Sequence, residues 1–125
     1  MPEQPEFPAR AEVLRRWRDV VAGATSREDG HRWAAPWVEG VASSPEDVMV
    51  LTGLQYLHGF DLVLEANGGY GHSASGAEGP YIKPPEEVEA DLDHWLRQSA
   101  LYDEDPPGYV ARKIAAAQEA LKRER

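Results

Sequence analysis

Apolar residues recur every three or four positions through most of this 125-residue chain, and helix-capping residues separate the repeats. This spacing places apolar side chains along one side of an α-helix, whereas a half-buried strand would need strict alternation. Start signals occur at Thr25–Glu28, Ser44–Asp47, Pro84–Glu87 and Asp105–Pro107. Together with a first helix over residues 9–22, they predict an all-α fold, a bundle-like domain of four or five helices.

The apolar stripes also predict which sides of the helices are buried. The helix expected over residues 45–58 is apolar nearly all round and should be the central one. Pro36 lies inside the preceding helix, where its missing N–H and its ring predict a kink or a break. The four tryptophans fall on apolar stripes, which favours core packing. The stripe expected to face the core from the last helix comprises Val110, Ile114, Ala117 and Leu121.

A glycine-rich segment interrupts the helices. Phe60–Glu65 partly alternates in polarity and is compatible with a short strand that pairs with Tyr81–Ile82, giving a minor two-stranded β element. Residues 66–80 contain five glycines, which predicts a long flexible loop, either a linker or a contact site for a partner. We expect residues 1–8, with their three prolines, to form a flexible arm and residues 9–125 to form a single domain.

Composition excludes several classes of protein. With no cysteine, the chain has no disulfide, thiolate metal site or cysteine nucleophile. No apolar run approaches the roughly 20 residues that span a bilayer, and the first residues lack the features of a signal peptide. We therefore expect a cytoplasmic protein without a membrane partner, as a monomer or weak dimer. A net charge of −9 argues against nucleic-acid binding, because the arginines of the first helix are interspersed with acids.

The acidic charge is concentrated in one region. Residues 60–108 hold eleven acids and two bases, so this stretch accounts for a charge of −9. Such a field favours association with a basic protein partner. The alternative is that these acids cap helices and keep the protein soluble. The candidate partner-binding residues are the acids Glu87, Glu89, Asp91, Asp93, Asp103 and Glu104, with Tyr70 and Tyr81 as aromatic anchors.

No pattern in the sequence predicts catalysis, a metal or a cofactor. Glu28 and His31, like Asp91 and His94, have the carboxylate-x-x-His spacing of di-metal bundles, but the expected central helix lacks the further carboxylates that such sites need. The glycine-rich segment has no lysine where a phosphate-binding loop requires one. We expect a non-catalytic protein, with a small-ligand pocket between the kinked second helix and the tryptophan-rich core as an alternative.

A wider pattern of caps and core residues suggests a family resemblance. It comprises Ser26–Glu28, Arg32–Val38, Leu54–Asp61, Pro80–Tyr81 and Glu87–Leu96. The chain resembles small helical proteins of GC-rich bacteria, some similar to the immunity proteins that neutralise colicin-D-type and polymorphic toxins. The resemblance implies an inhibitor without catalytic residues, whose acidic surface occludes a basic toxin. The alternative is an uncharacterised cytoplasmic protein that has no toxin partner.

Overall fold

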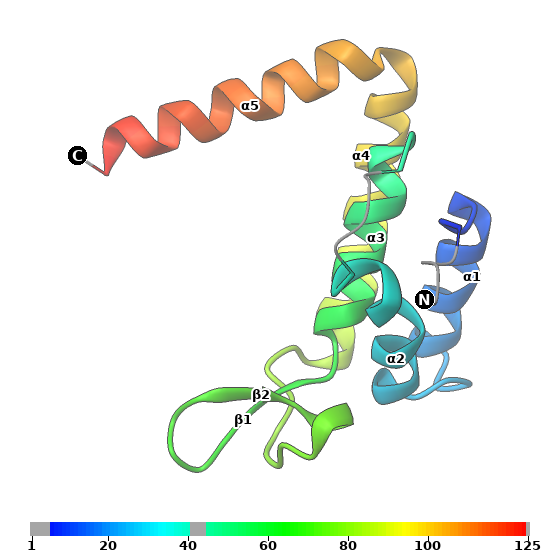
Figure 1. The fold of residues 1–125 in the computed structure, drawn as a ribbon, viewed down its shortest axis with the longest axis vertical. Coiled ribbons are helices and arrows are strands. Elements are labelled where there is room, and N and C mark those ends of the chain that lie inside the picture. The colour runs from blue at the N-terminus through cyan, green and yellow to red at the C-terminus, as the bar shows by residue number, and fades with distance from the viewer. Residues whose placement is uncertain (1–5, 41–44, 125) are drawn as a thin grey trace. The chain divides into compact units, whose positions relative to one another are not determined.

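The computed structural model describes residues 6–40 and 45–124 and confirms the all-α fold with a minor two-stranded sheet (Figure 1). The predicted arm over residues 1–8 falls largely outside the described residues, as does Ser44. The elements in chain order are α1 Arg10–Val21, α2 Arg27–Val38, α3 Val48–Gly59, β1 Leu62–Leu64, β2 Tyr70–His72, the 3-10 helix η1 Ser73–Ser75, α4 Pro85–Glu104 and α5 Pro106–Arg123. Within the described part of the chain, every helix falls short of the length and apolarity that crossing a bilayer requires.

Two helices begin later than the sequence predicts. Ser26 rather than Thr25 caps α2, and its hydroxyl accepts a hydrogen bond from the Asp29 amide. Asp47 caps α3 through the Met49 amide, so this helix begins at Val48 instead of residue 45. Both capping residues have an extended backbone. The side chain of each accepts a hydrogen bond from a backbone amide two or three residues later.

Of the kink or break expected at Pro36, the break does not occur, because α2 continues through it to Val38. A proline inside a helix removes the hydrogen bond to the carbonyl four residues earlier. Here the helix ends two residues after Pro36, so few later turns depend on the interrupted segment.

The chain divides into two compact units, Met1–Leu92 and Asp93–Arg125, with the boundary inside α4. In the first unit α2 packs against α3, and α1 packs against both. The core includes Trp17, which is fully buried against Phe60 with ring centroids 5.3 Å apart. Its indole N–H donates to the Val88 carbonyl at 3.1 Å, which ties α1 to the start of α4.

Predictions for the apolar side chains are confirmed in part. Trp17 and Trp95 are buried, whereas Trp33 and Trp37 are half-buried and pack edge-to-face on each other. In the second unit the prediction for α5 is wrong. Its stripe is not buried, since Ile114 is 54% and Leu121 is 60% exposed.

The reason is that α5 buries its first turn only. Tyr109 packs edge-to-face on Tyr102, and its hydroxyl donates to the Gln98 side chain at 2.9 Å. Asp105 caps the helix as predicted, accepting from the Gly108 amide. The later turns of α5 extend past this cluster and are exposed.

The glycine-rich segment is more regular than the predicted loop. β1 pairs antiparallel with β2, with Leu62 opposite His72. The predicted pairing with residues 81–82 is also present, as the amide of Ile82 donates to the Leu62 carbonyl and Val63 forms a bridge with Tyr81. The segment over residues 66–80 is therefore not loop throughout, because β2 and η1 lie inside it.

Candidate metal centre

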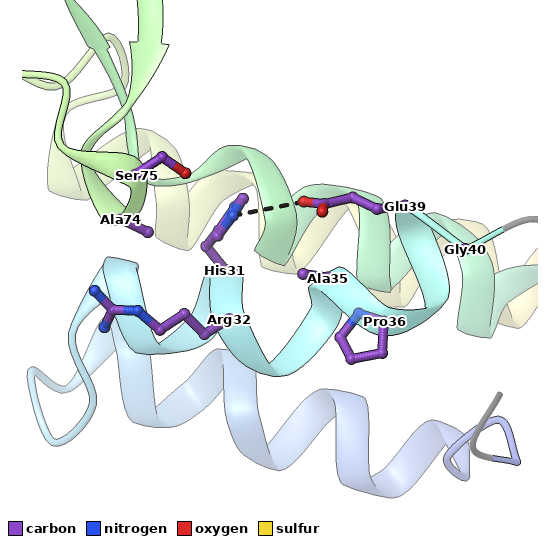
Figure 2. A pocket seen from close by; sticks show the side chains of 8 residues that line it. All are labelled: His31, Arg32, Ala35, Pro36, Glu39, Gly40, Ala74 and Ser75. Atoms are coloured by element: carbon purple, nitrogen blue, oxygen red, sulfur yellow. Dashed lines mark ion pairs between the residues drawn. The ribbon is translucent and has the colours of Figure 1, made fainter. Parts of the chain in front are cut away.

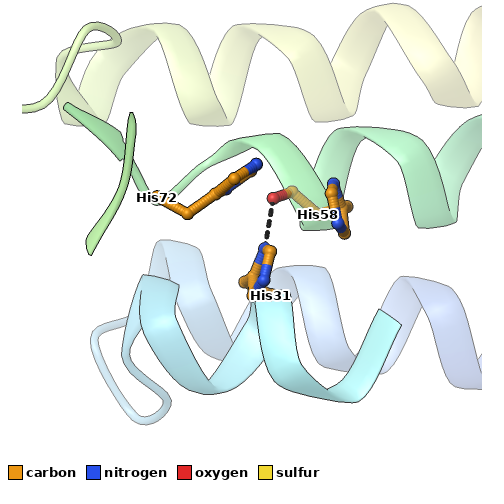
Figure 3. Close-up of side chains that lie close together, drawn as sticks. All are labelled: His31, His58 and His72. Carbon is orange, nitrogen blue, oxygen red and sulfur yellow. Dashed lines mark hydrogen bonds between the residues drawn. The ribbon is translucent and has the colours of Figure 1, made fainter. Parts of the chain in front are cut away.

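Three of the four histidines of the chain converge at one place (Figure 3). His31 lies in α2, His58 in the last turn of α3 and His72 at the end of β2. One ring nitrogen from each lies within 4.8 Å of the other two. A single point therefore lies within about 2.8 Å of all three, and zinc–nitrogen bonds of about 2.0–2.1 Å need inward shifts of less than about 1 Å.

Fixed acceptors orient two of these rings. His31 Nδ1 lies 2.8 Å from the backbone carbonyl of His58, and His72 Nδ1 lies 2.7 Å from a carboxylate oxygen of Asp61. A carbonyl or carboxylate oxygen can only accept, so each Nδ1 carries the proton. In the neutral rings Nε2 then keeps its lone pair, which is the arrangement that second-shell acceptors impose on metal-binding histidines.

Asp61 anchors the buried side of this cluster. Its side chain is fully buried. One oxygen accepts from His72, and the other accepts from the Ala74 amide at 3.0 Å. His31 Nδ1 is a further 3.3 Å neighbour. A buried carboxylate is costly without a compensating positive charge, so the surroundings of Asp61 favour a cation among the three rings.

Glu39, the C-terminal cap of α2, brings a second carboxylate to the solvent side of the cluster. Its Oε2 atom lies 2.6 Å from His58 Nε2 and 3.7 Å from His31 Nε2. The hydrogen bond from His58 lowers the pKa of Glu39, so this side chain is ionised at neutral pH. Glu39 therefore places one carboxylate oxygen beside two of the three rings.

Glu28 holds the glycine-rich segment against α2. It accepts hydrogen bonds from the Ser73 hydroxyl and, at 2.6 Å, from the Tyr81 hydroxyl. Burial acts to raise the pKa of Glu28, but these two hydrogen bonds outweigh it and the pKa is lowered. The same contact raises the pKa of Tyr81. Because Ser73 follows His72 directly, the hydrogen bond between Ser73 and Glu28 helps to position the His72 ring.

A pocket of about 540 Å³ lies beside the cluster (Figure 2). His31 and Glu39 point toward each other at its wall, with His31 Nε2 3.7 Å from Glu39 Oε2, while Ala35, Pro36 and Ser75 form other parts of the wall. Arg32 also lines the pocket, and its guanidinium pairs with Asp29 at 2.9 Å. The pocket thus reaches the cluster from the side of Glu39 and not from that of Asp61, which is fully buried.

The residues that the sequence singled out lie elsewhere. The acids Glu87, Glu89, Asp93, Asp103 and Glu104 are exposed on α4. Asp91 is half-buried and pairs with Lys83.

The two aromatic candidates differ from each other. Tyr70 is 70% exposed. Tyr81 contacts Glu28 through its hydroxyl and Arg27 through its ring, with 4.2 Å from guanidinium to ring centroid. The structure therefore gives Tyr81 an internal role that the sequence did not predict.

Sequence reasoning missed the histidine cluster. The Glu28–His31 spacing marked one member, but Glu28 binds Ser73 and Tyr81 instead of joining His31. His94, in the second such pair, is exposed. His58 and His72 carried no signal, because their separations from His31 match no known local motif. The one available hint was their position: His31 lies near the start of a predicted helix, His58 at the end of the next, and His72 in the glycine-rich segment.

Comparison with known proteins found no matching family model, no similar curated protein and no similar solved structure.

Proposed function

We propose that this protein binds a divalent transition-metal ion through His31, His58 and His72, with Glu39 as the fourth donor. The observation that carries the proposal is the convergence of three ring nitrogens, two of them on rings whose Nδ1 protons are held by fixed acceptors. Three imidazoles and one carboxylate suit zinc and its neighbours in the first transition row, whereas magnesium and calcium prefer oxygen donors.

Charge supports the same conclusion. The carboxylates of Asp61 and Glu39 lie on opposite sides of the cluster, one buried and one exposed. Together they balance the two positive charges of a divalent ion without an additional counter-ion. His58 Nε2, which now contacts Glu39, must present its lone pair when it becomes a ligand, and in the neutral ring the proton then sits on Nδ1.

The ion would join three elements that are distant in sequence. Its ligands come from α2, α3 and β2, and the β1–β2 pair has few residues of its own to bury. A two-stranded hairpin is marginally stable in isolation. We therefore expect metal binding to stabilise the hairpin against the helices as well as to create a reactive centre.

Zinc titration of the purified protein by calorimetry, with metal content measured after dialysis, tests this proposal. We expect one ion per chain. Alanine at His31, His58 or His72 should weaken binding by at least about tenfold, because a ligand is lost. His94→Ala is the matched control, since this exposed histidine should leave binding unchanged. Equal affinity in all four variants, or no binding by the unaltered protein, would refute the proposal.

A second function is favoured by a separate observation, the exposure of five acids on α4. We propose that these residues bind a basic protein, in the way an immunity-like protein occludes a toxin. The test is association with the product of the neighbouring reading frame, measured over a range of salt concentrations. The rate should fall steeply with salt and should slow when Glu89 and Asp93 are changed to lysine. A rate unaffected by both changes contradicts this role.

A further inference from the structure

We infer that the metal ion exchanges Glu39 for a small dicarboxylate, which enters through the adjoining pocket and places its second carboxylate against Arg32. This inference rests on the metal site proposed above. It adds the chemical class of the ligand, and it assigns Glu39 as the replaceable donor and Arg32 as the residue that selects the ligand.

The exposure of the four donors identifies the replaceable one. The side chains of His31, His58 and His72 are 7%, 16% and 29% exposed, whereas that of Glu39 is 58% exposed. Glu39 is also the cap residue that ends α2, so no later turn of the helix restrains it. A ligand on an exposed, weakly restrained side chain is the one that an incoming molecule can displace. Metal sites that act on substrates keep such an exchangeable position.

The charges around the pocket select an anion. Replacing the Glu39 carboxylate with another carboxylate leaves the charge of the groups bound to the ion unchanged. Arg32 supplies a second positive group in the same pocket. Its present partner, Asp29, is 65% exposed, and such surface ion pairs contribute little and are easily exchanged. A planar guanidinium binds a carboxylate through two parallel hydrogen bonds.

The size and walls of the pocket limit the ligand. A volume of about 540 Å³ is in the range of small-molecule sites. Ala35 and Pro36 add apolar surface to the pocket wall, and Ser75 adds a hydroxyl. The ion held by His31 and the guanidinium of Arg32 are two positive centres that line one pocket, and they match a short carbon chain with a carboxylate at each end.

Visible absorption of the cobalt-substituted protein separates the two steps. Cobalt alone should produce the absorption of a low-coordinate nitrogen–oxygen site. If it does not, the metal proposal fails before any ligand is added. Succinate or glutarate should then change the spectrum, with an affinity about tenfold above that of acetate, because only the dicarboxylates reach Arg32.

Three variants complete the test. Arg32→Ala should abolish the preference for dicarboxylates over acetate, while Arg18→Ala, which removes an equal charge from an exposed site on α1, should preserve it. Glu39→Ala should bind the anion more tightly, because the internal competitor is gone. The inference is overturned if cobalt binds but no carboxylate changes the spectrum, if acetate binds as tightly as succinate, or if loss of Glu39 leaves anion affinity unaltered.

Discussion

Asp61→Asn should weaken metal binding although Asp61 does not touch the ion. An asparagine has nearly the same shape, and its carbonyl oxygen can still accept from the Ala74 amide, as one oxygen of Asp61 does at 3.0 Å. Its NH₂ group then faces His72 Nδ1, where a carboxylate oxygen now lies at 2.7 Å. Because an NH₂ group donates, Nδ1 must accept and the ring proton moves to Nε2. The lone pair that would bind the metal is thereby lost.

The size of this effect follows from the role of outer-shell partners. Loss of such a partner typically costs 10- to 100-fold in metal affinity, or about 1.4–2.7 kcal/mol. Competition for zinc against a chromophoric chelator measures the affinity. Nitrogen NMR of the His72 ring measures the tautomer directly and separates a proton shift from a general loss of structure. Asp93→Asn, at an exposed acid of α4, is the matched control.

The refuting outcome is specific. If Asp61→Asn binds zinc as tightly as the unaltered protein while NMR shows the shifted tautomer, then His72 does not ligate through Nε2. If the tautomer does not shift, the reasoning about the Asp61 hydrogen bond is wrong.

Three further predictions concern stability. Removing the metal with a chelator should lower the free energy of unfolding. Relative to protein with free zinc at 100 times the dissociation constant, the loss should be about 2.7 kcal/mol, measured by calorimetric melting. An unchanged melting temperature would contradict the role of the metal in joining the hairpin to the helices. Because the pKa of Glu28 is lowered in the folded protein, its contribution to stability is present above its unfolded pKa and is lost as pH falls through the folded pKa. Glu28→Gln should therefore lower the urea midpoint more at pH 7 than in acid below the folded pKa of Glu28, and an equal loss in both conditions would refute the assignment. Gly79→Ala should destabilise by roughly 1–3 kcal/mol, because φ is +152° and an added Cβ would collide with the Leu64 carbonyl. Gly76→Ala has positive φ but open space around it, so urea unfolding should show a smaller loss there.

Most of the helical structure could be predicted from local patterns. The capping residues, the prolines and the spacing of apolar side chains act within a few residues of each other, and the predicted helices appear with small shifts such as the start of α3 at Val48. The errors have tertiary causes. Tyr109 finds partners in Tyr102 and Gln98, whereas Ile114 extends beyond them.

The strand β2 shows why the structure of the glycine-rich segment was harder to predict than that of the helices. Tyr70–His72 has little strand character of its own, and it forms a strand because its backbone pairs antiparallel with β1. Gly79 permits the next part of the chain to pass close to Leu64, so residues 80–82 can bond to the other side of β1. Neither condition can be recognised from the residues of the segment alone.

The sequence by itself determined the class of the fold, the absence of thiolate chemistry and the regional concentration of acid, because these depend on composition and on neighbours along the chain. Only the tertiary structure decided where the candidate chemistry lies. His31 and His58 meet because α2 packs on α3, and the β1–β2 register then brings His72 to Asp61. A metal site requires side chains to meet within a few ångströms, and that proximity comes from long-range packing, which no local spacing of residues records.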